Sequence, residues 1–282
     1  MGKTPSLPTM IGVRDRVRAW VVPEQPAGVR YVDDPDERRM VRIEIVIVFA
    51  ISLGLAGVTS LISLLDSLLK AVPLNRQHVA INVPQAHAEF LDFLGQLANI
   101  TKLLAWGCLG VYLLYRAGFR LAEIGLSRFR PGPDIRLGLG LTALIGIPGL
   151  SLYFAARALD LNLTVQPSTL TDTWWRVPVL VIAAAANAWA EEALVLGYFI
   201  SRLRQLGLSE NASVVSAAVL RGSYHLYQGF GGFVGNFVLG LVFGRIWQRT
   251  NRLWPMVVAH TLLDVISFVG YALLVNHLSF LK

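Results

Sequence analysis

Two adjacent glutamates, Glu191 and Glu192, lie inside a segment, residues 177–200, that is apolar enough to cross a membrane. A charged side chain near the centre of a bilayer costs roughly 2.5–3.5 kcal/mol on insertion scales. The pair therefore requires polar partners on neighbouring helices. With such partners, a glutamate carboxylate can act as a general base that activates a water molecule.

Candidate partners occur in two later apolar segments. Arg221 and His225 are four residues apart, and so are His260 and Asp264. On a helix, residues at this spacing share one face, so each pair is predicted to present both groups together. We therefore expect these four side chains to converge with the glutamates, as intramembrane ionisable groups commonly mark a functional site.

Two asparagines are supporting candidates. Asn187 is one helical turn before Glu191 and on the same face, and Asn236 lies in a glycine-rich apolar segment. Small residues at four-residue spacing permit close approach of helices in a membrane. In this segment they are Gly231, Gly235, Gly240 and Gly244.

This set of groups is compatible with more than one chemistry. Carboxylates and histidines can activate water and stabilise an oxyanion. Alternatively, Glu191, His225 and His260 could hold a zinc ion that activates its bound water. Both routes lead to hydrolysis of an acyl bond, and the cofactor stays open between them. A proton- or cation-coupled transport protein is the alternative outside enzymology.

The composition places these groups in a membrane protein. Of the 282 residues, 54% are hydrophobic and only 15% are charged, whereas soluble domains contain about 25% charged residues. The net charge of +7 is explained by basic residues at cytoplasmic helix ends, so no nucleic-acid partner is expected. The single cysteine, Cys108, excludes an internal disulfide and a multi-cysteine metal site.

The predicted fold class is all-α, a polytopic integral membrane bundle of about seven transmembrane helices. The expected spans are 41–69, 98–116, 137–158, 177–201, 211–229, 235–248 and 253–275. Residues 1–40 are expected to form a polar cytoplasmic tail, and residues 41–282 the transmembrane bundle. Most of the 25 lysines and arginines then fall on the side of the N-terminus, which predicts a cytoplasmic N-terminus in the cell (plasma) membrane.

The order of the polar motifs resembles the CPBP family of intramembrane proteases, which includes the CAAX prenyl endopeptidases and Abi-type bacteriocin-immunity relatives. The family motif Glu-Glu-x-x-x-Arg-Gly corresponds to residues 191–197, Phe-x-x-x-His to residues 221–225, and His-x-x-x-Asn/Asp to residues 260–264. The resemblance covers about residues 140–275. It implies an intramembrane endopeptidase whose substrate is a membrane-associated peptide or protein, surrounded by membrane lipid.

The resemblance also implies a role for each residue. Glu191 is the expected water-activating base, assisted by His225, and Glu192 orients the group. His260 and Asp264 are expected to bind the scissile carbonyl as an oxyanion site. The motifs do not decide between glutamate-dependent and metal-dependent hydrolysis.

Two positions depart from the family motifs. Leu196 replaces the arginine of the first motif, and Arg221 replaces the phenylalanine of the second. We interpret them as one change, in which Arg221 neutralises Glu192 from the neighbouring helix. The departures also leave open a catalytically inactive immunity or scaffold member of the same family.

Overall fold

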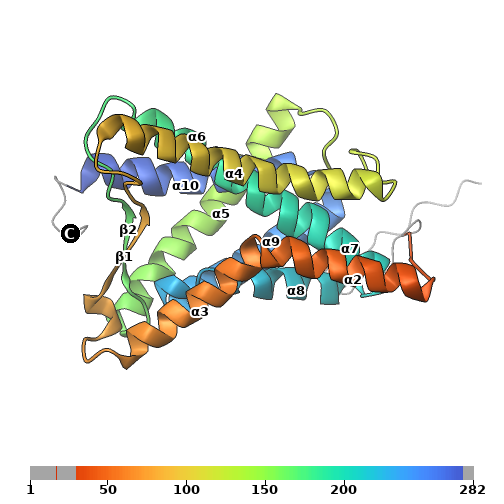
Figure 1. The fold of residues 1–282 in the computed structure, drawn as a ribbon, viewed down its shortest axis with the longest axis horizontal. Coiled ribbons are helices and arrows are strands. Elements are labelled where there is room, and N and C mark those ends of the chain that lie inside the picture. Colours follow the sequence, from red (N-terminus) through yellow and green to blue (C-terminus); the bar gives the residue numbers. More distant parts are fainter. Residues whose placement is uncertain (1–16, 18–29, 276–282) are drawn as a thin grey trace, which may run out of the picture.

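The computed structural model describes residue 17 and residues 30–275, which form a bundle of long helices (Figure 1). The helices, in chain order, are α2 (Pro35–Ala50), α3 (Leu53–Leu69), α4 (Glu89–Arg116), α5 (Pro131–Ala158), α6 (Arg176–Glu191), α7 (Ser201–Gln205), α8 (Glu210–Ser223), α9 (Phe230–Thr250) and α10 (Trp254–Leu274). A π-helical segment, Glu192–Ile200, joins α6 to α7 without a break. The predicted all-α polytopic bundle is confirmed. Most of the polar tail expected over residues 1–40 lies outside the described residues.

In the described part of the chain, fewer helices than expected are long and apolar enough to cross a membrane. Within residues 30–275, five helical stretches are long and apolar enough to span, or six if α2 and α3, which meet at a 52° bend, form one span. The expected helix over 211–229 ends at Ser223, so α8 has 14 residues. At 1.5 Å per residue it is about 21 Å long, short of the roughly 30 Å hydrocarbon core. The expected count of about seven is therefore not confirmed.

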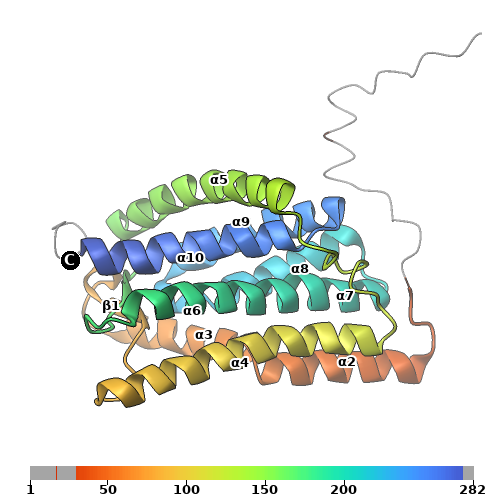
Figure 2. The same ribbon diagram turned by 90° about the horizontal axis from the view of Figure 1, so that it is seen from above.

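The loops lie at two opposite ends of the bundle, and at each end hydrogen bonds connect them. At one end, strand β1 (His78–Asn82) of the α3–α4 loop pairs in parallel with strand β2 (Thr164–Ser168) of the α5–α6 loop. Beside them, Leu163 N donates to Gln228 O of the α8–α9 turn at 2.9 Å. The bonds at the other end are Val32 N to Gln205 O, Arg30 Nη1 to Gly118 O and Leu253 N to Gly125 O. Successive segments thus run between the two ends (Figure 2).

The stretch from α6 to α7 is the centre of the bundle. In its most apolar part 67% of the residues are buried, against 11–33% in the four other candidate spans. It lies among α4, α10 and α8. The paired glutamates are therefore in the core, while the outer helices expose apolar side chains such as Leu55, Leu144 and Ile147. A lipid environment accounts for that exposure.

The close packing of α8 on α9 depends on glycine. A Cβ at Gly240 would lie 2.9 Å from Ala218 Cα and 3.4 Å from Arg221 Cδ. A Cβ at Gly244 would lie 3.1 Å from the side chain of Val214. The small residues in α9 thus let α8 approach closely enough to bring Arg221 into the core.

Candidate active site

The two glutamates lie at the junction between α6 and the π-helical segment. Glu191 is the last residue of α6, and Glu192 is the first π-helical residue. Their exposed fractions are 4% and 0%. π-helical segments are rare and are frequently found at functional sites, because they change the direction of side chains within a helix. Here the change occurs at the pair that the sequence singles out.

Glu192 is held by two basic side chains from different helices. Its Oε1 accepts a hydrogen bond of 2.6 Å from Nη2 of Arg221 in α8. The same oxygen lies 2.8 Å from Nδ1 of His260 in α10. Arg221 and Glu192 are both fully buried. The expected contact between Arg221 and Glu192 is therefore present, and it links three segments of the core.

Glu191 has a different set of partners. Its Oε2 accepts a 2.6 Å hydrogen bond from the hydroxyl of Tyr224. Its Oε1 accepts a longer bond, 3.3 Å, from Nδ2 of Asn187 one turn earlier. Nη1 of Arg221 lies 4.0 Å from Oε2, beyond direct hydrogen-bond distance. Glu191 Oε1 is thus the less tightly engaged oxygen.

Asp264 joins the same cluster through Asn187. Nδ2 of Asn187 donates to Asp264 Oδ2 at 3.0 Å as well as to Glu191. His260 Nε2 lies 3.7 Å from the same Asp264 oxygen, which is too far for a hydrogen bond. Asn187, one of the two supporting candidates, therefore bridges the carboxylates of α6 and α10.

His225 is placed by a turn rather than by a helix. Because α8 ends at Ser223, the prediction that Arg221 and His225 share a helix face is wrong. The ring of His225 packs on Tyr224, with 4.8 Å between the ring centroids, and its Nδ1 lies 3.4 Å from Nε2 of Gln228. Its Nε2 is buried and has no hydrogen-bond partner among the described residues.

Asn236 makes its hydrogen bond elsewhere. Its side-chain amide donates to the carbonyl of Gly232 at 3.0 Å, one turn earlier in α9. In the described part of the chain, no hydrogen bond connects it to the glutamates. The other predicted residues are brought together by the contacts above.

Buried polar atoms without a partner are concentrated in this cluster. Among the described residues nine such side-chain atoms occur, and four belong to the cluster. They are Glu192 Oε2, Arg221 Nε, Arg221 Nη1 and His225 Nε2. Leaving a buried donor or acceptor unsatisfied costs about 1–3 kcal/mol. The cluster therefore has unused capacity to bind a polar group.

The cluster does not have the arrangement of a metal site. Within the described residues, no group of three or more His, Cys, Asp and Glu side chains is placed to hold a metal ion. Glu191, His225 and His260 thus do not converge as zinc ligands in this arrangement, and we derive no step through a metal ion.

Two features of the cluster were missed from the sequence. Tyr224 lies inside the second motif, three residues after Arg221, and that spacing is the one signal of its position. The π-helical segment leaves no mark in the hydrophobic pattern. Leu196, in that segment, is fully buried in the apolar core where the family motif has arginine.

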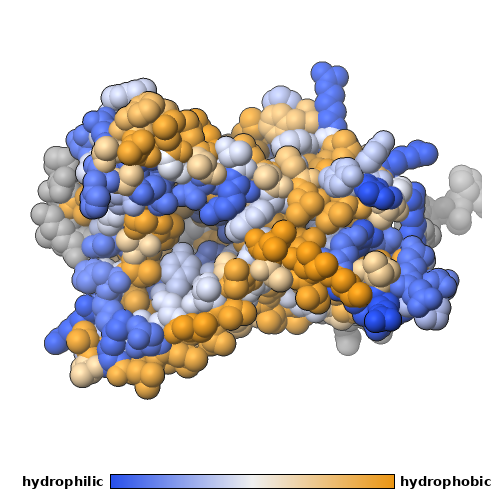
Figure 3. All heavy atoms as spheres, viewed as in Figure 1, coloured by the Kyte–Doolittle hydropathy of each residue, from blue (hydrophilic) through white to orange (hydrophobic). Residues whose placement is uncertain are grey.

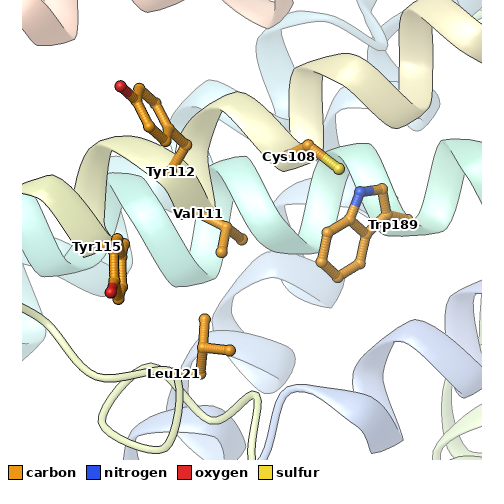
Figure 4. A pocket seen from close by; sticks show the side chains of 6 residues that line it. All are labelled: Cys108, Val111, Tyr112, Tyr115, Leu121 and Trp189. Atoms are coloured by element: carbon orange, nitrogen blue, oxygen red, sulfur yellow. The ribbon is translucent and has the colours of Figure 1, made fainter.

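One apolar pocket lies apart from this cluster. It lies between α4, the loop that follows α4, and α6 (Figure 4), and is lined by Cys108, Val111, Tyr112, Tyr115, Leu121 and Trp189. No residue of the cluster lines it. Figure 3 shows a second hollow, between α4 and α3, where the surface is less apolar than on the outer helical faces.

Residues 173–266 match the family model described as type II CAAX prenyl endopeptidase Rce1-like. This part of the chain is Rce1-like. The predicted family resemblance is confirmed, over a shorter range than the expected 140–275. The Rce1-like segment contains every residue of the cluster, from Asn187 to Asp264. Together with the apolar helices, it indicates an integral membrane protein with a segment similar to CAAX-type proteases.

No curated protein and no solved structure is significantly similar to the chain.

Proposed function

We propose that this protein is an intramembrane endopeptidase that hydrolyses a peptide bond of a membrane-associated substrate. The observation that carries the proposal is a cluster of three carboxyl groups, two histidines and one arginine inside an Rce1-like segment. Both glutamates, Arg221 and His260 are buried, and several polar atoms of the cluster are unsatisfied. Purely structural ion pairs in a membrane core are expected to be fully hydrogen-bonded. Unused donors and acceptors favour a site for water and a substrate carbonyl.

Glu191 is the general base in this proposal. Its Oε1 takes a proton from a water molecule, and the water oxygen forms a bond to the scissile carbonyl carbon. The tetrahedral intermediate then collapses, the C–N bond breaks, and the leaving amine takes the proton back from Glu191. Water and peptide are consumed, and a carboxylic acid and an amine are formed. His225 holds the water in this proposal, and its unpaired Nε2 supports that role.

In this proposal His260 donates to the oxyanion, and Asp264 joins the site as a neutral carboxylic acid, because a carboxylate accepts hydrogen bonds but does not donate them. The 3.7 Å separation between His260 Nε2 and Asp264 leaves that nitrogen available to donate to a substrate oxygen. With Nδ1 already facing Glu192, donation from both nitrogens requires the protonated ring. Arg221, whose Nη1 has no hydrogen-bond partner in the described structure, adds positive charge close by.

Glu192 orients these groups instead of reacting. It is fully buried and contacts both Arg221 and His260 through one oxygen. Adjacent helical residues point about 100° apart, so one glutamate can face the water while the other faces the basic side chains. The different partners of Glu191 and Glu192 agree with this division.

We also propose that the N-terminus is cytoplasmic and that the protein resides in the plasma membrane. The end of the bundle that contains the start of α2 also contains Arg116, the last residue of α4, and the α4–α5 connection with Arg120, Arg128 and Arg130. Basic residues prefer the cytoplasmic side.

The test is cleavage of a library of membrane-anchored peptides by the purified protein in lipid nanodiscs, detected by mass spectrometry. We expect cleavage by the wild type, its loss in Glu191→Gln, and full activity in the matched control Glu89→Gln, an exposed glutamate at the start of α4. Ion flux in proteoliposomes without cleavage would instead establish a transport protein. If neither activity is detected, the protein is a catalytically inactive scaffold or immunity protein.

A further inference from the structure

We infer that Tyr224 is a positioning residue for Glu191 and that α3, outside the Rce1-like segment, holds Tyr224 in place. The inference rests on the proposed role of Glu191. It concerns a residue that the family motifs do not specify and a helix that the family model does not cover.

Tyr224 contacts Glu191 directly through its hydroxyl. The Tyr224 hydroxyl donates to Glu191 Oε2 at 2.6 Å, the shortest hydrogen bond made by Glu191. Tyr224 is 5% exposed, so water does not replace this donor readily. A hydrogen bond to an ionised group is short and directional, and it fixes the rotation of the carboxylate. Oε2 is thereby held, and Oε1 is left to face the reacting water.

The backbone of Tyr224 is anchored by α3. Tyr224 is the C-cap of α8, so its N–H still donates to the Leu220 carbonyl at 3.4 Å, but no following helical turn donates to its own carbonyl. Instead, Ser60 Oγ of α3 donates to the Tyr224 carbonyl at 3.0 Å. A Cβ at Gly57, one turn earlier in α3, would lie 2.7 Å from Ser223 Oγ. Gly57 and Ser60 together let α3 pack directly against the turn that contains Tyr224.

Tyr224 also packs against His225. The Tyr224 ring packs on the His225 ring at 4.8 Å between centroids, so one residue contacts both the proposed base and its histidine. Small displacements of a reacting group cost about 100-fold in rate. Loss of the Tyr224 hydroxyl should therefore lower kcat by about 10- to 100-fold and leave KM unchanged, because substrate binding does not use this hydroxyl.

A matched control is present in the same turn. The Tyr227 hydroxyl accepts a hydrogen bond from Gln228 Nε2 at 2.9 Å and makes no hydrogen bond to Glu191. Tyr224→Phe and Tyr227→Phe thus remove the same atom three residues apart. Ser60→Ala tests the anchor, with Ser63→Ala, an exposed serine of α3, as its control.

The experiment compares these variants by two readouts. The first is kcat and KM for a cleaved peptide. The second, which does not depend on proteolysis, is the modification of Glu191 by dicyclohexylcarbodiimide in nanodiscs, quantified by peptide mass spectrometry. We expect Tyr224→Phe to lower kcat alone and to increase Glu191 modification several-fold, and Ser60→Ala to do both more weakly. Ser63→Ala should match the wild type in both readouts. Tyr227→Phe should match it in Glu191 modification, the readout for which it is the control, because its hydroxyl bonds the Gln228 amide that also faces His225.

Equal modification of Glu191 in Tyr224→Phe and Tyr227→Phe would overturn the inference, and so would an unchanged kcat. If the wild type cleaves no peptide, the proposed function fails, while the modification experiment still decides whether Tyr224 holds Glu191. If Tyr224→Phe does not fold, Ser60→Ala decides by the same two readouts.

Discussion

Nη2 of Arg221 lies 2.6 Å from Oε1 of Glu192, and both side chains are completely buried. The arginine comes from α8, whereas the family motif has it four residues after Glu192, where this chain has Leu196. The guanidinium also lies over the ring of Phe243, 5.9 Å from its centroid, in α9. A buried cation thus contacts Glu192, although it comes from a different helix from the one that the family motif specifies.

Removal of the arginine should be severely destabilising. In Arg221→Phe, Glu192 is left as a buried charge whose remaining basic contact is His260, and breaking a buried pair costs about 3–5 kcal/mol. We expect a large fall in the thermal unfolding temperature in detergent. The double variant Leu196→Arg with Arg221→Phe should recover part of that loss, because it restores the arginine of the family motif. No recovery in the double variant would show that the two positions did not exchange one function.

The two glutamates should respond differently to the same substitution. Glu192→Gln removes the charge that Arg221 contacts directly, and should cost about 3–5 kcal/mol of unfolding free energy. Glu191→Gln keeps an amide oxygen for the Tyr224 hydroxyl, and should cost about 1 kcal/mol or less while abolishing cleavage. Thermal unfolding of both variants in the same detergent measures the difference. Equal loss of stability would contradict separate roles.

Gly240 should be intolerant of even one methyl group. Its added Cβ would meet the backbone of Ala218 at 2.9 Å and push α8, with Arg221, away from the core. Overpacking of this kind costs about 1–3 kcal/mol. The control is Gly149→Ala in α5, where no atom lies within 4 Å of the added Cβ, so its stability should stay equal or rise slightly. If the two glycines tolerate alanine equally, α8 is not held by close contact at Gly240.

Much of this arrangement could be predicted from the sequence, because buried charges in apolar helices are costly and must find each other. Glu192, Arg221 and His260 form the contacts expected on that ground. Helical spacing also placed Asn187 beside Glu191.

The end of α8 could not be predicted in the same way. The pattern placed the turn at residues 229–235, but the chain leaves the helix after Ser223 and α9 begins at Phe230. Periodicity identifies the buried face of a helix, whereas its end depends on contacts from elsewhere, here α3 and the β2 loop. Gly229, with φ of 111°, marks the start of α9 rather than the end of α8. Tyr224 was not predicted as a site residue for the same reason, because its position depends on the end of α8 at Ser223.

The most direct test of the account is hydrolysis in water enriched in oxygen-18. The purified protein in nanodiscs is incubated with a cleaved membrane peptide, and the new C-terminal carboxylate is analysed by mass spectrometry. We predict one oxygen-18 atom in that carboxylate for the wild type and for Glu89→Gln, and no product for Glu191→Gln. Labelled product formed by Glu191→Gln at the wild-type rate would contradict the assignment of Glu191 as the base.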